Sequence, residues 1–278
     1  MDGQIPPKRR TSAQISARPA LQPAACARHL LRELNVQAIP IQPRQIAEQL
    51  QIVVWEREME SQYDGCLMRV GDAWGILLNS LIQSQSRKNF TIAHELGHYQ
   101  LDWGQTLQHR CRHNDLRAFG SHQLEEQRAN QFAVELLMPY PIFQADATDL
   151  SEVGLPAIDT LAARYSTSLT STAIRYTRLS QHVCAIVSAE NGRVKYFAYS
   201  EGFRENCDCY LAKNQPLHSD SFAYHLSESR SKEITEKQGE VPLSYWCATK
   251  SDRTVIEQSR HLRRMNQVLS FLWLPEVC

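Results

Sequence analysis

The sequence lacks the segments that would place a protein in or across a membrane. No apolar run approaches the roughly 20 residues that span a bilayer, and no charged start leads into an apolar stretch with a small-residue cleavage site. A charge bias is also missing, because 30 Lys and Arg residues balance 30 Asp and Glu residues. A net charge of zero gives no overall attraction to nucleic acid or to anionic lipid. We therefore expect a soluble, cytoplasmic protein with no membrane partner.

Cysteine is too sparse and irregular for a disulfide-stapled scaffold. The chain has eight cysteines in 278 residues, far below the density of small secreted domains. Cys207 and Cys209 form the one close pair, and a single intervening residue is poor spacing for a shared zinc ion. The sequence therefore predicts free thiols.

The segment from Phe90 to Tyr99 carries the pattern HExxH. Because a helix turns about 100° per residue, His94 and His98 lie on one face and can offer two imidazole nitrogens to one metal ion. Glu95 lies one step round the helix, where it can act as a general base toward water at that metal. Apolar residues recur every three to five positions around the motif, which predicts that the histidine face looks inward. The alternative is a pair of surface histidines on an amphipathic helix.

A catalytic zinc site needs a third protein ligand. A metzincin would have Gly three residues and His six residues after His98, and the sequence has neither. In the other common arrangement a Glu on a second helix completes the site, and residues 124–139 have the apolar periodicity of such a helix. Glu126 falls on its buried side, whereas Glu125 points about 100° away. Helical phase therefore favours Glu126 over Glu125.

Other polar residues near these two segments remain candidates for supporting roles. Asn130, one turn past Glu126, is a candidate partner of a ligand or contact for substrate. Three histidines between the helices are rival ligands, although each alone is more often a solvated loop residue: His109, His113 and His122. The same three histidines, with Tyr99 and Tyr140, are candidate donors to the oxyanion of a hydrolytic reaction.

Two stretches of the chain resemble the ImmA/IrrE metallopeptidases, which are bacterial zinc endopeptidases of the gluzincin type. The stretches are Arg87–His98 and Ala129–Pro139, with Glu126 just before the second. The resemblance covers residues 26–179 well and the remaining tail more loosely. Asp102 departs from the pattern, because many members have a histidine at this position, which is not a direct metal ligand.

The resemblance implies a metal-dependent endopeptidase with Glu95 as catalytic acid/base and three metal ligands: His94, His98 and Glu126. Zinc is the implied metal, and manganese also suits two histidines and a glutamate with open positions. The implied substrate is an XRE-type helix-turn-helix transcriptional repressor, whose cleavage switches on stress-response or mobile-element genes. The alternative is a non-catalytic protein that binds or senses a partner on a peptidase-like scaffold.

These patterns predict an α+β fold. A minimal gluzincin-like zinc peptidase domain, with a small antiparallel-rich sheet and two helices for the HExxH motif and the third ligand, precedes a helix-turn-helix-like pair and a small α+β module. The predicted units are a disordered basic tail at 1–22, the metallopeptidase domain at 23–150, the helix-turn-helix-like segment at 151–180, and a regulatory or sensor-like domain at 181–278.

Within the first 150 residues, periodicity and turn residues predict helices at 24–34 and 43–50 and strands at 52–55, 65–70 and 73–79. We expect residues 74–79 at the edge of the sheet, where an extended substrate could add as a further strand unless a loop covers that edge. Ser86 or Asn89 is expected to cap the HExxH helix, and a loop is expected from Pro141.

The later part of the chain has weaker signals. The segment 158–176 resembles a helix-turn-helix, but its second helix offers only Arg175 and Arg178, so direct DNA binding is not expected. The dipeptide Asn191-Gly192 predicts a hairpin. Other predicted elements are strands at 244–248 and 268–274 and helices at 221–229 and 253–265.

Overall fold

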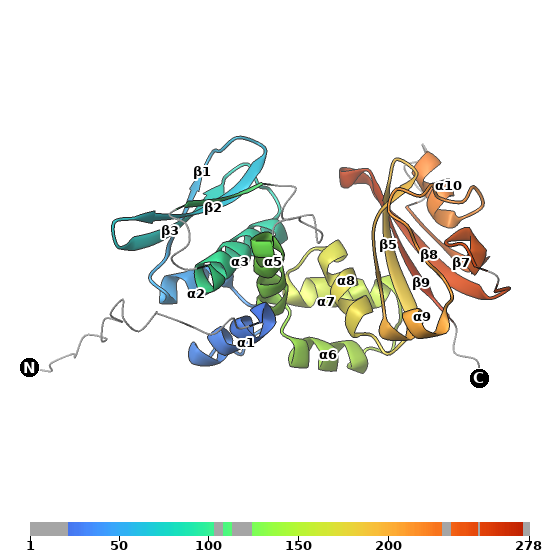
Figure 1. The fold of residues 1–278 in the computed structure, drawn as a ribbon, viewed down its shortest axis with the longest axis horizontal. Coiled ribbons are helices and arrows are strands. Elements are labelled where there is room, and N and C mark those ends of the chain that lie inside the picture. Colours follow the sequence, from blue (N-terminus) through green and yellow to red (C-terminus); the bar gives the residue numbers. More distant parts are fainter. Residues whose placement is uncertain (1–21, 103–107, 113–123, 230–234, 250, 275–278) are drawn as a thin grey trace, which may run out of the picture.

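The computed structural model describes residues 22–102, 108–112, 124–229, 235–249 and 251–274. Figure 1 shows an elongated arrangement, with one sheet in the N-terminal half, a second sheet in the C-terminal half, and a group of helices between them. This mixture of helices and sheets confirms the predicted α+β class. The tail predicted at residues 1–22 lies almost entirely outside the described residues.

The first sheet has the strand order β1-β3-β2-β4. Its strands are β1 (Val53–Arg57), β2 (Tyr63–Val70), β3 (Ala73–Asn79) and β4 (Gln108–Arg112). β1 runs parallel to β3, and the other pairs are antiparallel. The prediction that residues 74–79 form an edge strand is wrong, because β1 pairs with β3 rather than with its chain neighbour β2. The described edges are therefore β1 and β4.

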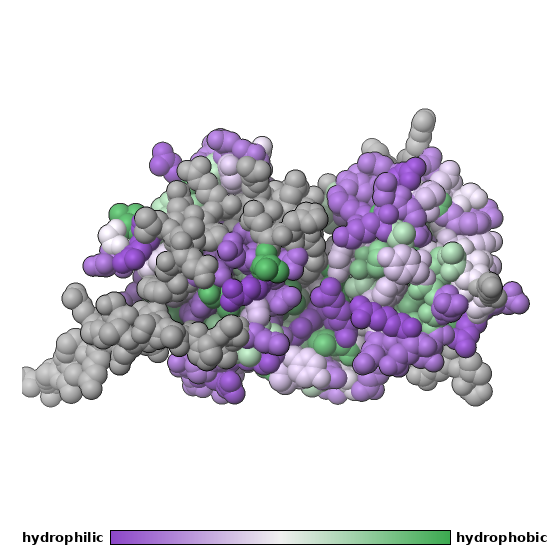
Figure 2. Space-filling view, in the orientation of Figure 1, coloured by the Kyte–Doolittle hydropathy of each residue, from purple (hydrophilic) through white to green (hydrophobic). Residues whose placement is uncertain are grey.

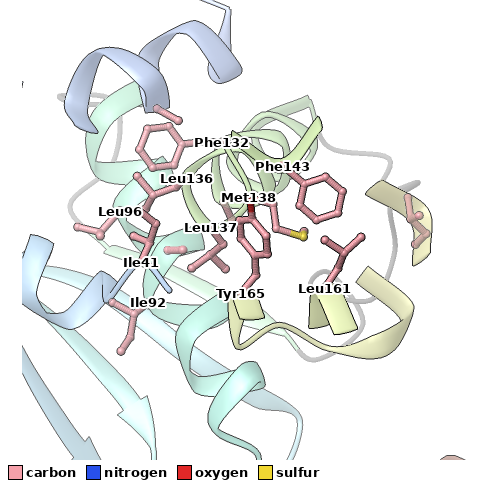
Figure 3. Packing of buried hydrophobic residues seen from close by; sticks show 14 of the residues in the cluster. Ile41, Ile92, Leu96, Phe132, Leu136, Leu137, Met138, Phe143, Leu161 and Tyr165 are labelled. Carbon is pink, nitrogen blue, oxygen red and sulfur yellow. The ribbon is translucent and has the colours of Figure 1, made fainter. Parts of the chain in front are cut away.

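Helices pack on one side of this sheet. α2 (Pro43–Gln49) and α3 (Gln85–Leu101) contact its strands, and α1 (Pro23–Glu33) and α5 (Leu124–Leu137) pack against each other and against α3. Figure 3 shows Leu96 of α3 close to Leu136 of α5, and the two helices share one hydrophobic core. The prediction that Ser86 or Asn89 caps this helix is wrong. α3 begins at Gln85, and Ser84 caps it by accepting the Arg87 amide hydrogen at 3.4 Å.

Three helices connect the two sheets: α6 (Tyr140–Asp149), α7 (Leu155–Tyr165) and α8 (Leu169–Leu179). α7 and α8 confirm the predicted helix pair, with Ser168 as the cap of α8. The loop predicted from Pro141 is wrong, since α6 occupies that position. Pro141 fits there because the first turn of a helix does not need the missing backbone N–H.

The second sheet is antiparallel, with the strand order β6-β5-β9-β8-β7. Its strands are β5 (Cys184–Glu190), β6 (Arg193–Tyr199), β7 (Glu236–Pro242), β8 (Thr254–Leu262) and β9 (Gln267–Trp273), with helices α9 (Glu201–Asn206) and α10 (Phe222–Glu228) against it. The hairpin at Asn191-Gly192 is confirmed. Two predictions are wrong: the helix at 253–265 is β8, and residues 243–245 form a 3₁₀ turn where a strand was expected.

β8 escaped prediction because its buried residues include polar ones. Glu257 and Ser259 are both fully buried, so the strand does not show the simple alternation of apolar and polar residues. The Glu257 carboxylate accepts hydrogen bonds from the Ala223 amide at 2.7 Å and from the Trp246 indole at 3.2 Å. These partners compensate for the burial of a charged group and attach α10 to the sheet.

The second sheet is buried on both faces. Cys184 and Ile186 of β5 join the core that also contains α7 and α8, whereas Ala185 and Val187 join a second core under α9 and α10. The hydrophobic core therefore continues across residue 180, where the sequence predicts a domain boundary, and the domain limits stay predictions. The face in Figure 2 is mainly hydrophilic, as expected when apolar side chains gather inside. Among the described helices, none has the length and apolar character required to cross a bilayer.

Cys209 and Cys247 form a disulfide, which contradicts the prediction of free thiols throughout. Tyr210 pairs with Ala248 in an isolated antiparallel β-bridge, so the two segments that carry Cys209 and Cys247 lie side by side. A separation of 38 residues hides this proximity from sequence reasoning. Among the described residues, Cys26, Cys66, Cys184 and Cys207 are buried thiols outside this disulfide.

Reduction of this disulfide should lower the free energy of unfolding by about 3–4 kcal/mol, because it frees a loop of 38 residues in the unfolded chain. Urea unfolding with and without reductant measures the change, and peptide mapping of the unreduced protein identifies the linked pair. A Cys209→Ser/Cys247→Ser variant should show no response to reductant. An equal response of this variant would contradict the assignment.

Glu135 joins three helices to the end of α5. Its side chain is 3% exposed, and its two carboxylate oxygens lie 2.9 Å from Arg28 Nη1 and 2.6 Å from Arg175 Nη2. The same carboxylate accepts the Tyr140 amide hydrogen at 2.9 Å. α1, α6 and α8 are thereby attached to the helix that carries Glu126.

Replacing this carboxylate by an amide should destabilise the protein. We expect Glu135→Gln to lower the free energy of unfolding by about 3 kcal/mol, because Arg175 would then be buried without its counter-charge. Urea unfolding of the metal-free protein measures the loss. Glu125→Gln, a change of the same type at an exposed position of α5, should stay within about 0.5 kcal/mol of the native protein. Equal stability of both variants would contradict the role of Glu135.

Candidate metal centre

α3 places the two histidines of the motif in the interior. His94 and His98 are 0% and 1% exposed, and their Nε2 atoms lie 3.0 Å apart. The helix can bury this face because α5 packs directly against it, as Figure 3 shows for the neighbouring apolar residues. The alternative of two surface histidines is therefore wrong.

Glu126 reaches the histidines from α5. Its carboxylate oxygens lie 3.1 Å from His94 Nε2 and 3.4 Å from His98 Nε2. One atom from each of the three residues lies within 4.8 Å of the other two, which is close enough for a single metal ion. Glu125 is exposed, as helical phase predicts. The three residues that the sequence proposed as ligands are thus together in one buried group.

The close approach of α3 and α5 depends on a glycine in the motif. A Cβ atom on Gly97 would lie 3.0 Å from Ala129 Cα and 3.1 Å from the Ala129 carbonyl oxygen. Both are backbone atoms that cannot move aside without shifting α5. Gly97 and the small Ala129 therefore let the helices approach closely enough for Glu126 to reach both rings.

The outer hydrogen bonds of the two rings show that the group suits a metal. His94 Nδ1 lies 2.9 Å from Asn130 Oδ1, and His98 Nδ1 lies 3.0 Å from an oxygen of Asp102. Because both partners are acceptors, each ring donates from Nδ1 and directs the lone pair of Nε2 toward Glu126. Glu126 Oε2 is buried and accepts no hydrogen bond. Three buried electron-pair donors that converge fit a cation among them.

The electrostatics of the site also favour a positive charge. Burial alone would lower the pKa of His98, but hydrogen bonds to Asp102 and Glu126 and the nearby charge of Glu95 raise this pKa to about 10. Burial alone would raise the pKa of Glu126, but His94 and His98 shift it well below its ordinary value. The pocket therefore favours a positive charge among these residues.

Glu95 lies beside this group and is held by the first sheet. It is completely buried, and one carboxylate oxygen accepts the backbone amide hydrogen of Leu67 at 3.0 Å. A Cβ atom on Gly65, two residues earlier on β2, would lie 3.1 Å from the other oxygen and 2.5 Å from Thr91 Cγ2. Sequence reasoning missed β2 as part of the site, and a glycine within a strand is the one signal that could have indicated a close approach.

The other candidates from the sequence are placed less favourably. Eleven residues of helix, or about 16 Å, separate Glu126 from the end of α5, and Tyr140 lies beyond that end. Tyr99 packs edge-on against Trp74, with ring centroids 5.6 Å apart. His113 and His122 lie outside the described residues. The backbone of His109 pairs with Leu67 in the first sheet, and its side chain is not described.

Gly65→Ala should destabilise the protein, because the new methyl group would overlap Thr91 Cγ2. We expect a loss of about 1–3 kcal/mol in the free energy of unfolding, measured by urea titration of the metal-free protein. Thr91→Ser removes Cγ2 but can keep the hydroxyl bond to the Arg87 carbonyl, so the double variant should recover most of the loss. A single Gly65→Ala variant as stable as the native protein would contradict this packing.

Comparison with known proteins agrees with the geometry. Residues 47–177 match the model of peptidase family M78, described as the IrrE N-terminal-like domain. A solved structure named Mycobacterium tuberculosis transcriptional regulator is similar in fold, with a TM-score of 0.55 and 12% identity over 91% of this chain and 76% of that chain. A search of curated proteins found no significant match. The resemblance predicted from the sequence is thus confirmed for one segment, because residues 47–177 are similar to the IrrE N-terminal-like domain of the M78 peptidases.

Proposed function

We propose that the protein is a zinc-dependent endopeptidase. The observation that carries this proposal is the buried convergence of His94, His98 and Glu126, with the carboxylate of Glu95 beside them. Four buried polar side chains are costly to keep in one place unless they hold a ligand and use it. The similarity of residues 47–177 to the M78 peptidase model supports the same interpretation.

The roles of the residues follow from their positions. His94, His98 and Glu126 would hold the zinc ion, with manganese as the alternative metal. A metal in this position supplies Lewis acidity, which polarises the scissile carbonyl and makes water a better nucleophile near neutral pH. Glu95 takes the proton from the attacking water and passes it to the nitrogen of the leaving amine. The Leu67 amide orients the Glu95 carboxylate for both transfers.

The substrate that we propose is an XRE-type helix-turn-helix repressor, whose cleavage in the cytoplasm would switch on stress-response or mobile-element genes. The support for this substrate is the family resemblance, together with a chain that has no net charge to attract DNA by itself. The packing of the helix pair agrees with a protein partner, because Arg175 of α8 binds Glu135 internally and Arg178 lies 3.3 Å from the Tyr196 hydroxyl. We infer that α7 and α8 connect the two sheets and do not read DNA.

The test compares the zinc-loaded native protein with its Glu95→Gln variant on the repressor encoded beside its gene. Mass spectrometry of the products should show one new cut by the native protein and a rate at least about 100-fold lower for the variant, because the proton acceptor is lost. Zinc content should be the same in both. Glu125→Gln, an exposed neighbour of Glu126, should cleave at the native rate.

Two outcomes would contradict the proposal. Equal cleavage by the native protein and the Glu95→Gln variant would mean that another site performs the reaction. An intact repressor that co-elutes with both proteins would instead support the alternative, a non-catalytic protein that binds its partner through a peptidase-like scaffold.

A further inference from the structure

Asp102 lies between His98, a proposed metal ligand, and α5, the helix that carries the proposed ligand Glu126. It is the C-cap of α3, and its backbone amide donates to the His98 carbonyl at 2.9 Å. One oxygen of its side chain lies 3.0 Å from His98 Nδ1, and the other lies 3.2 Å from Arg128 Nη1. The carboxylate is 2% exposed, so both contacts are made away from water.

The two histidines therefore have different partners. His94 donates to the neutral amide of Asn130, whereas His98 donates to a carboxylate. A hydrogen bond to a charged acceptor is stronger than one to a neutral acceptor, and it places more electron density on the opposite ring nitrogen. His98 should therefore be the stronger electron-pair donor of the two.

Arg128 offsets the free-energy cost of burying the Asp102 carboxylate beside His98. A carboxylate buried to this extent needs a counter-charge, and Arg128 supplies one while its own side chain stays 34% exposed. Arg128 also lies two residues after Glu126 on α5. The ion pair thus links the end of the histidine helix to the helix of the third ligand.

We propose that Asp102 and Arg128 form a positioning pair for the metal site. Asp102 fixes the ring orientation of His98 and strengthens its Nε2 as a ligand through negative charge, and Arg128 holds Asp102 and joins α3 to α5. This inference rests on the proposed function in one respect, namely that His94, His98 and Glu126 hold a metal. Retention of that metal then depends on the charge of Asp102.

The test measures zinc affinity by competition with a chelating dye, alongside urea unfolding of the metal-free protein. Asp102→Asn keeps the size of the side chain and one acceptor oxygen but removes the charge. We expect its zinc affinity to fall by about 10- to 100-fold. The visible absorption of the Co²⁺-substituted variant should also change, because the spectrum reports the ligand geometry.

Two further variants separate charge from packing. Asp102→Asn leaves the Arg128 guanidinium facing a neutral amide, which should also lower the free energy of unfolding of the metal-free protein. Asp102→Asn/Arg128→Gln removes that guanidinium, so this free energy should recover while zinc affinity stays low. Glu135→Gln is the control, because it removes the charge of a buried carboxylate that is likewise paired with arginine but lies on α5 away from the site. It should lower stability without changing zinc affinity.

The outcomes distinguish this inference from the proposed function. Native zinc affinity in Asp102→Asn, or recovery of affinity together with stability in the double variant, would overturn the positioning role and leave the metal site intact. Failure of the native protein to bind zinc, manganese or cobalt would instead overturn the proposed function itself.

Discussion

The structure depends on a single electrostatic constraint, the burial of two imidazole rings and a carboxylate with their electron pairs directed at one point. Away from water such a group is stable only where a cation can be held among the electron pairs and where each outer polar atom has a partner. The surrounding chain meets these conditions locally. Asn130 and Asp102 bind the outer ring nitrogens, and the glycine in the motif lets the two ligand helices approach each other.

The same constraint explains why residues far from the metal centre matter. Three ligands on two helices keep their distances only if the helices cannot slide, and a shared core plus the Arg128–Asp102 ion pair near the start of α5 prevent sliding beside the site. The ion pairs of Glu135, at the other end of α5, contribute to stability without touching the site. On the sheet side, Asp64 of β2 binds Arg87 in the first turn of α3 through two hydrogen bonds, which fixes the strand that contacts Glu95. The site is therefore held from both helices and from the sheet.

The sequence allowed prediction of whatever follows from local periodicity and spacing. The grouping of His94, His98 and Glu126 follows from helical phase, and the hairpins and the helix pair follow from turn and capping residues. What it missed arises from contacts between distant segments. The contact of the Leu67 amide with Glu95 depends on the backbone and leaves no side-chain pattern in the sequence. Cys209 and Cys247 pair across 38 residues. β8 lacks the usual alternation because Glu257 and Ser259 are polar and buried. Pairing of β1 with β3 likewise required the register of the whole sheet.

The double-sided burial of β5 and β9 has a consequence for how the two halves of the chain can communicate. α7 and α8 pack on one face of this sheet, and the Gln258 side chain accepts the Leu155 amide hydrogen at 2.8 Å. The two halves therefore share an apolar interface, whereas a free hinge motion requires a small, polar one. Any signal from the C-terminal half would have to reach the N-terminal half through repacking of side chains in this shared core. A chain that ended after α8 would expose to water the apolar face of α7 and α8 that β5 and β9 now cover, so removal of the C-terminal half should make the remaining half prone to aggregation.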